Sequence, residues 1–209
     1  MTATLTPAAC DRDLATKITL SLLGYGVIAG PVYVTTSVLQ GLARDGFSFT
    51  HHQWSLLANG PWGWIQTANL IGTGLMIILF GTGLHRNGAP AARLVAAMGL
   101  GMIGAGIFKA DPGNGFPAGT PEGPGQVTLA GTLHLATSGV GFLCLAIACY
   151  LMARRFAPVY SRVTAIFFLA GFVVIATGGG AVWTNLVFTA AIIAIFTWTT
   201  TLALHEYRR

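Results

Sequence analysis

Two ionisable side chains lie beside apolar stretches of the sequence, where they could do chemistry. Asp111 closes the run FKAD at the edge of one apolar stretch, and His134 lies inside the next one. An adjacent carboxylate fixes the tautomer of an imidazole and raises its pKa above the free value of about 6.5. We therefore expect Asp111 and His134 to form a polar pair, and they are the candidate catalytic residues. The alternative is structural: His134 bonds a carbonyl group or Ser138 between helices, and Asp111 only begins the turn DPGNG.

Other polar side chains fall at a similar depth in the apolar stretches. Gln66, Asn69 and Thr73 share one face at the helical spacing i, i+3, i+7, and Asn185 lies at the start of the last stretch. Polar groups in hydrocarbon need partners, and ionisable groups there usually face the bundle interior or a watery cavity. We therefore expect a polar pocket that opens to the outside of the cell. Its predicted ligand-binding residues are His134, Asp111, Asn69, Gln66, Ser138, Asn185 and Ser55.

The histidines raise the question of a metal. His51, His52, Asp111 and His134 are ligand types that suit zinc, and a catalytic zinc site needs three protein ligands and one open position. The sequence has no HExxH motif, no paired CxxC and no histidines four residues apart on a predicted helix. We expect no cofactor, and zinc bound by these four side chains stays open as the alternative.

The composition shows what must position these side chains. Hydrophobic residues make up 54% of the chain and charged residues 8%, whereas a soluble domain carries about a quarter charged residues. The 28 glycines lie within apolar runs, which is typical of membrane helices that pack closely. The sequence therefore predicts a multi-pass protein of the cell membrane, the inner or plasma membrane of a prokaryote, with the lipid bilayer as its partner.

Six stretches are long enough to span a bilayer, which takes about 20 mostly apolar residues. Runs such as LMIILFGTGL lack the alternation of barrel strands. We predict an all-α, polytopic transmembrane bundle of six helices within residues 17–206, with a cytoplasmic N-terminal tail, 1–16, and a cytoplasmic C-terminal end, 207–209. The predicted helices lie near 17–43, 62–84, 90–110, 126–153, 160–181 and 183–204.

The basic residues predict the orientation of the bundle. Nine of the eleven Lys and Arg residues flank alternate ends of the six stretches, and only Arg44 and Lys109 fall at the opposite ends. Because Lys and Arg accumulate in cytoplasmic loops, both termini are predicted to be cytoplasmic. These loops also account for the net charge of +5, so we expect no nucleic-acid partner. The nine residues are Arg12, Lys17, Arg86, Arg93, Arg154, Arg155, Arg162, Arg208 and Arg209.

Three segments carry a resemblance to a known family. SLLANGPWGWIQTAN, FKADPGNGF and TLAGTLHLAT occur in an order that resembles the DUF998 family of six-helix bacterial and archaeal membrane proteins. The resemblance covers most of the chain and implies the architecture, but the family name records an unknown function. In the family a histidine and a proline often precede the serine, whereas HHQWS keeps His52 and lacks the proline. The positions that the resemblance singles out are Ser55, Gln66, Asn69, Asp111, Pro112 and His134.

Three functions stay open at this stage, and only one of them is enzymatic. The favoured one is binding of a small amphiphile or lipid head group in the outward-facing pocket, with the Trp-rich segment 44–61 as a lid. The second is an intramembrane hydrolase for lipid-like substrates that uses His134 and Asp111, completed by His52 and assisted or not by a metal. The third is a structural subunit of a homo-oligomer or larger membrane complex, which would use glycine-rich helix faces as contact sites.

Overall fold

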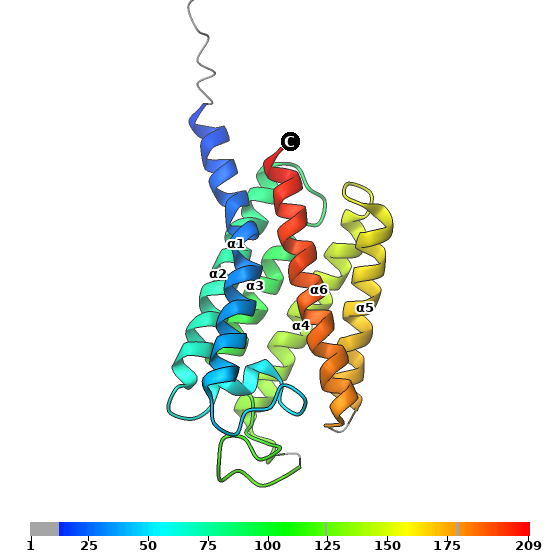
Figure 1. Ribbon diagram of the computed structural model, residues 1–209. Coiled ribbons are helices and arrows are strands. Elements are labelled where there is room, and N and C mark those ends of the chain that lie inside the picture. The colour runs from blue at the N-terminus through cyan, green and yellow to red at the C-terminus, as the bar shows by residue number, and fades with distance from the viewer. Residues whose placement is uncertain (1–12, 124, 179) are drawn as a thin grey trace, which may run out of the picture.

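The structure is a computed structural model that describes residues 13–123, 125–178 and 180–209 (Figure 1). Arg12 and most of the predicted tail lie outside the described residues. Within those ranges the chain forms six α-helices and one short 3-10 helix, η1, and no β-strand, which confirms the predicted all-α bundle. The elements are α1 (Leu14–Ala43), η1 (Trp54–Ala58), α2 (Gly63–Arg86), α3 (Ala92–Ile107), α4 (Leu129–Met152), α5 (Pro158–Thr177) and α6 (Val182–Tyr207).

Five of the described helices are long and apolar enough to cross a membrane, and α3 is the short one. The predicted stretch 90–110 extends beyond α3 at both ends, because the chain leaves the helix after Ile107 and Phe108 adopts an extended backbone. The architecture is that of a multi-pass membrane protein.

The six helices form a closed ring. Each helix packs against its neighbours in the sequence, and α6 packs against α1 as well as α5. Successive helices run in opposite directions, so the start of α1 and the end of α6 lie at the same end of the bundle (Figure 1). In the same view α4 and α5 lie close together near their connecting turn and separate toward their other ends.

Glycines allow α3 to approach both of its neighbours. Gly99 faces Gly74 of α2, and Gly101 faces Gly141 of α4, so closely that a Cβ atom at either α3 position would overlap backbone atoms. Helix association in lipid depends on such close van der Waals packing. These glycine faces are therefore occupied within the bundle. The structural-subunit hypothesis would require them to be free for contact with another protein.

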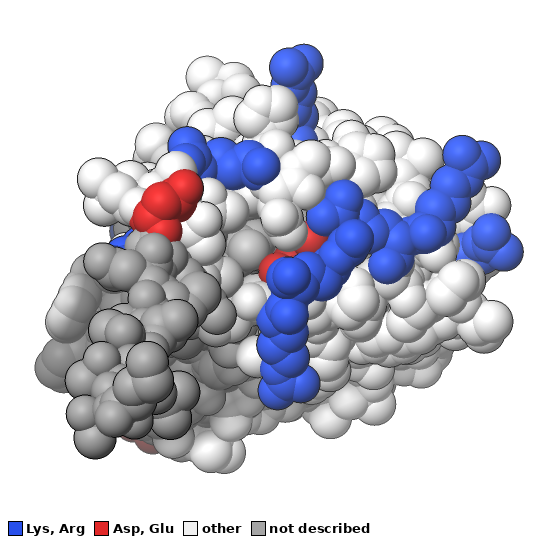
Figure 2. Space-filling model, turned by 90° about the horizontal axis from the view of Figure 1, so that it is seen from above, with Lys and Arg blue, Asp and Glu red and all other residues white. Residues whose placement is uncertain are grey.

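The end of the bundle that carries the C-terminus is basic. Figure 2 looks down on this end and shows Lys and Arg side chains gathered over it. Of the described Lys and Arg residues, only Arg44 and Lys109 lie near the helix ends on the opposite side. The start of α1 and the end of α6 thus share the basic end of the bundle (Figure 1).

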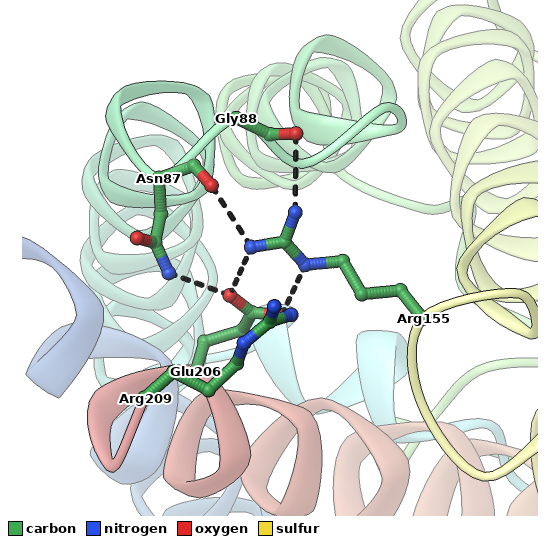
Figure 3. Close-up of polar contacts among 5 residues, drawn as sticks. All are labelled: Asn87, Gly88, Arg155, Glu206 and Arg209. Atoms are coloured by element: carbon green, nitrogen blue, oxygen red, sulfur yellow. Dashed lines mark hydrogen bonds and ion pairs between the residues drawn. The ribbon is translucent and has the colours of Figure 1, made fainter.

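A buried acidic side chain joins three segments at this end (Figure 3). The side chain of Glu206 is 0% exposed, and it accepts hydrogen bonds from Arg155 Nε at 2.7 Å and from Asn87 Nδ2 at 2.6 Å. Arg155 also donates to the carbonyl oxygens of Asn87, at 2.8 Å, and Gly88, at 3.2 Å. Hydrogen bonding to the Glu206 carboxylate raises the pKa of Arg155 above its ordinary value. The ion pair thus ties the end of α6 to the α2–α3 and α4–α5 turns.

We expect Arg155→Gln to lower the free energy of unfolding by about 3 kcal/mol, because it leaves the buried Glu206 carboxylate with only the longer ion pair to Arg209, at 3.7 Å. Arg154→Gln is the matched control, since this neighbouring arginine is exposed and has no hydrogen-bond or ion-pair partner among the described residues. Thermal unfolding in detergent measures both variants. Equal losses of stability in the two would contradict a specific role for the ion pair.

Candidate functional site

The short helix α3 creates an unusual requirement inside the bundle. With 16 residues it rises about 24 Å, which is less than the hydrocarbon thickness of about 30 Å. The last carbonyl groups of any helix have no partner within that helix, and in hydrocarbon no water replaces it. The C-terminal end of α3 therefore needs hydrogen-bond donors from elsewhere in the protein.

His134 supplies the donor. Its Nδ1 lies 3.0 Å from the carbonyl oxygen of Ala105 and 2.8 Å from that of Phe108. Because a carbonyl oxygen only accepts, Nδ1 carries a proton, and Nε2 of the neutral ring carries the lone pair. No described residue makes a hydrogen bond to Nε2. The structural alternative from the sequence, a bond from His134 to a carbonyl group, is thus the arrangement observed.

Asp111 binds the opposite end of the neighbouring helix. Its carboxylate accepts hydrogen bonds from the backbone N–H of Thr128, at 2.9 Å, and from Thr128 Oγ1, at 2.5 Å. Thr128 is the N-cap of α4 and itself accepts from the backbone N–H of Gly131 at 3.1 Å. A negative charge is favourable beside a helix N-terminus. A Cβ atom on Gly131 would overlap the carboxylate, which explains a glycine at this position.

The predicted hydrogen bond between His134 and Asp111 is therefore wrong. Each side chain instead binds unpaired backbone groups at a helix end: His134 on α4 binds the end of α3, and Asp111 after α3 binds the start of α4. The physical reason is that these backbone groups cost more if left unpaired than the two side chains gain from each other. The hydrolase hypothesis requires Asp111 to orient the imidazole of His134, and Asp111 does not do so.

A cavity of about 330 Å³ lies inside the ring, in the half away from the C-terminus. It meets the surface at Leu135 of α4, which is 56% exposed, and at the exposed Ala176 of α5. Its apolar wall includes Met102, Phe142, Phe172, Phe188, Ile192 and Phe196, and its polar lining includes Gln53, Ser55, Asp111, His134, Ser138 and Thr189. Every helix and η1 contribute to the lining, so the ring arrangement itself creates the space.

Trp54 of η1 lines this cavity with an unpaired polar group. The residue is only 6% exposed, its ring lies 5.9 Å from that of Tyr33, and its Nε1–H has no hydrogen-bond partner among the described residues. A buried donor without a partner costs about 1–3 kcal/mol, and such groups usually meet a water or ligand. From the sequence, Trp54 is one residue of the predicted lid segment 44–61, and nothing there marks it as a cavity residue.

Two segments, 44–62 and 108–123, cover the end of the ring opposite the C-terminus (Figure 1). We call them the loop cap; the first of them contains η1. His52 joins the two segments, because its Nε2–H donates to the carbonyl oxygen of Asn114 at 2.7 Å while its Nδ1 accepts from the backbone N–H of Ser48 at 2.8 Å. Phe116 is fully buried against Leu56 and Leu57. The loop cap is therefore a folded, packed structure.

The zinc alternative gains no support from this geometry. Both ring nitrogens of His52 are engaged within the loop cap, Nδ1 of His134 is bound to α3, and the Asp111 carboxylate is bound to Thr128. In the part of the chain that the structure describes, no group of three or more His, Cys, Asp and Glu side chains could hold a metal ion. His51, the remaining candidate, is exposed.

The predicted ligand-binding residues separate into two groups. His134, Asp111, Ser55 and Ser138 line the cavity. Gln66, Asn69 and Asn185 do not, and all three have hydrogen bonds within the protein. The structure thus brings four of the seven side chains to one cavity.

The second group holds helices and loops together. Gln66 Nε2 donates to Ser37 Oγ at 3.1 Å, and Asn69 Nδ2 donates to the Tyr33 carbonyl oxygen at 3.1 Å, which joins α1 to α2. Asn185 Nδ2 donates to the carbonyl oxygen of Phe49 at 2.8 Å, which joins α6 to the loop cap. These amides satisfy buried backbone and side-chain groups.

Comparison with known proteins adds a family but no activity. The model of a family described as a protein of unknown function, DUF998, matches residues 27–205, a range that contains the whole cavity and confirms the resemblance drawn from the motifs. No curated protein and no solved structure matches the chain.

We expect His134→Ala to lower the free energy of unfolding by about 2 kcal/mol, because the carbonyl groups of Ala105 and Phe108, at the end of α3, lose their donor. His134→Asn should keep most of the stability, since the amide nitrogen of asparagine lies near the position of Nδ1 and can donate in its place. Melting temperatures in detergent compare the two variants with the unaltered protein. If both variants lose the same stability, hydrogen bonding from Nδ1 is not what His134 contributes.

Proposed function

The chain belongs to the DUF998 family of proteins of unknown function, and from this premise we propose that this integral membrane protein binds a small amphiphile in the cavity of its helix ring. The observation that supports the proposal is the cavity of about 330 Å³, with apolar walls and a polar end where Trp54 and His134 have unpaired hydrogen-bonding atoms. Binding pockets for small molecules measure roughly 300–1,000 Å³ and combine apolar walls with a few such polar groups.

The polar lining favours a particular head group. Among the described residues that line the cavity, Asp111 is the one charged residue, and none is Lys or Arg. An anionic head would meet a carboxylate without a compensating cation, which is unfavourable. A hydroxyl group suits the site, because it can both donate, as the lone pair of His134 Nε2 requires, and accept, as Trp54 Nε1–H requires. The ligand is thus an uncharged amphiphile with one or more hydroxyl groups and an apolar tail.

The position of the opening supports access from the lipid. The loop cap covers the end of the ring, whereas the exposed lining residues Leu135 and Ala176 lie on α4 and α5, which separate toward this end (Figure 1). An amphiphile dissolved in the membrane would reach the cavity sideways between these helices, with its tail already in hydrocarbon. The sequence-based expectation was a pocket that opens to the outside of the cell, whereas this route starts in the bilayer.

We expect monocaprin, a glycerol ester with a single short chain, to raise the melting temperature of the detergent-solubilised protein by about 5–10 °C at about 100 times its Kd. Capric acid, whose carboxylate would approach Asp111, should give a much smaller shift. His134→Asn should abolish the monocaprin shift, because asparagine keeps the donor to α3 but lacks Nε2. Thr132→Ala is the matched control on the same helix, since Thr132 is exposed and does not line the cavity.

The same experiment tests the alternatives. Equal monocaprin shifts in His134→Asn and the unaltered protein would remove the proposed role of Nε2. The absence of any shift, together with no lipid retained in native mass spectrometry, would contradict amphiphile binding altogether. Release of capric acid from monocaprin by the purified protein, lost in His134→Asn, would favour the hydrolase hypothesis instead.

The orientation of the bundle is also a proposal, supported by the Lys and Arg residues at the end that carries the C-terminus (Figure 2). We propose that this end is cytoplasmic and that the membrane is the inner or plasma membrane of a prokaryote. A green fluorescent protein fused after Arg209 should fluoresce in a bacterial host, and a periplasmic alkaline phosphatase fused there should be inactive. The reverse pattern would contradict the proposed orientation.

A further inference from the structure

A second hollow, of about 410 Å³, lies on the outer wall of the ring where α1 ends and α2 begins. Gln40 lines it from α1, Arg44 and Trp62 line it from the loop cap, and Ile65 lines it from the first turn of α2. None of these residues lines the central cavity. Leu39 and Trp62, at its rim, are 61% and 58% exposed, as expected for side chains that face lipid near the membrane surface.

Gln40, which lines this hollow, has a buried acceptor without a partner among the described residues. The residue is only 6% exposed, and its Nε2 donates to the carbonyl oxygens of Trp62, at 2.8 Å, and Leu57, at 3.4 Å. Exchanging the amide nitrogen and oxygen would place an oxygen against these two acceptors, so the orientation of the amide is fixed. Oε1 therefore points elsewhere, and no described residue donates to it.

Arg44 contributes an uncompensated cation to the lining of the same hollow. Its NH2 group donates to the carbonyl oxygen of Asn59 at 2.9 Å, and its guanidinium lies 5.1 Å from the centre of the Phe116 ring. NH1 is buried without a partner, and no carboxylate among the described residues forms a salt bridge with Arg44. Burial lowers the pKa of this guanidinium. A partly buried cation without a counter-charge is unfavourable until an anion joins it.

We propose that this hollow binds the head group of a phospholipid from the adjacent leaflet, with the phosphate beside Arg44 and a donor of the head group on Gln40 Oε1. Arginine is well suited to phosphate oxygens. The donor is an ammonium group, as in phosphatidylethanolamine, or a hydroxyl group, as in phosphatidylglycerol. A free phosphate ion would satisfy Arg44 only, whereas a phospholipid also places its chains on the exposed wall of Leu39 and Ile65.

The test uses a difference between two lipids that share the phosphate and the chains. Phosphatidylcholine has no donor on its head group, so dioleoyl-phosphatidylethanolamine should bind the purified protein about tenfold more tightly, in line with a hydrogen bond between a charged and a neutral group. Native mass spectrometry with each lipid added in mild detergent measures the bound fractions. This comparison needs no variant, and equal retention of the two lipids would overturn the proposal.

Variants then assign the contacts. Arg44→Gln should reduce binding of phosphatidylethanolamine about tenfold, and Gln40→Met should reduce it to the level of phosphatidylcholine. Lys109→Gln is the matched control, because it removes the other described cation at this end without touching the hollow. A loss in Lys109→Gln as large as that in Arg44→Gln would show a nonspecific charge effect and overturn the proposal.

Two further arms separate this site from the alternatives. Inorganic phosphate that displaces phosphatidylethanolamine at millimolar concentration would show an ion site and overturn a lipid as the occupant. The thermal shift from monocaprin should be the same in Gln40→Met and the unaltered protein, since the central cavity is lined by other residues. The two proposals therefore stand or fail separately.

Discussion

The structure depends on a constraint that water-soluble proteins meet easily and membrane proteins do not: a helix that ends within the bilayer leaves carbonyl groups without donors. Here α3 is that helix, and an imidazole on α4 closes its end while a carboxylate after α3 closes the start of α4. The exchange explains why a chain with so few charges keeps a histidine within an apolar stretch. It also fixes the relative height of two helices, whose glycines let them approach closely.

The central cavity follows from the same arrangement. Because α3 ends early, the chain between α3 and α4 folds over the ring and joins the segment after α1 in the loop cap, with His52 and Asn59 bonding across the two. The cap closes the ring at one end, and the ion pair of Glu206 fastens the turns at the other. Between these two tied ends, the large side chains of α4, α5 and α6 leave an unfilled space. Tying at both ends lets a ring of helices keep a hollow without collapsing.

Sequence reasoning predicted the features that depend on long runs of residues and missed those that depend on single partners. Six apolar stretches are a strong signal, and all six are helices. The depth of His134 in its helix and its need for a hydrogen-bond partner could also be predicted. Its partner could not be predicted, because every residue has a backbone carbonyl group and the sequence does not show which ones lack a donor. Asp111, the nearest acidic residue by depth, was therefore the expected partner. The same reason explains why Gln66, Asn69 and Asn185 were expected in the pocket and lie outside the cavity lining. Nothing in the sequence distinguishes an amide that binds a ligand from one that bonds within the protein. Trp54 could not be distinguished in the sequence from Trp62 and Trp64, which follow it in the chain and are exposed in the structure.

The neighbour-to-neighbour packing of the ring bears on how the protein is made. Apart from that of α6 with α1, the main contacts between the described helices join helices that follow one another in the chain, so each new helix can dock on the previous one as it leaves the translocation machinery. Until α6 docks, the first five helices would form an open crescent, and the hollow gains its last wall only at that step. A molecule that lies in the crescent at that moment becomes surrounded by helices but keeps a way out at Leu135 and Ala176, where the cavity meets the surface.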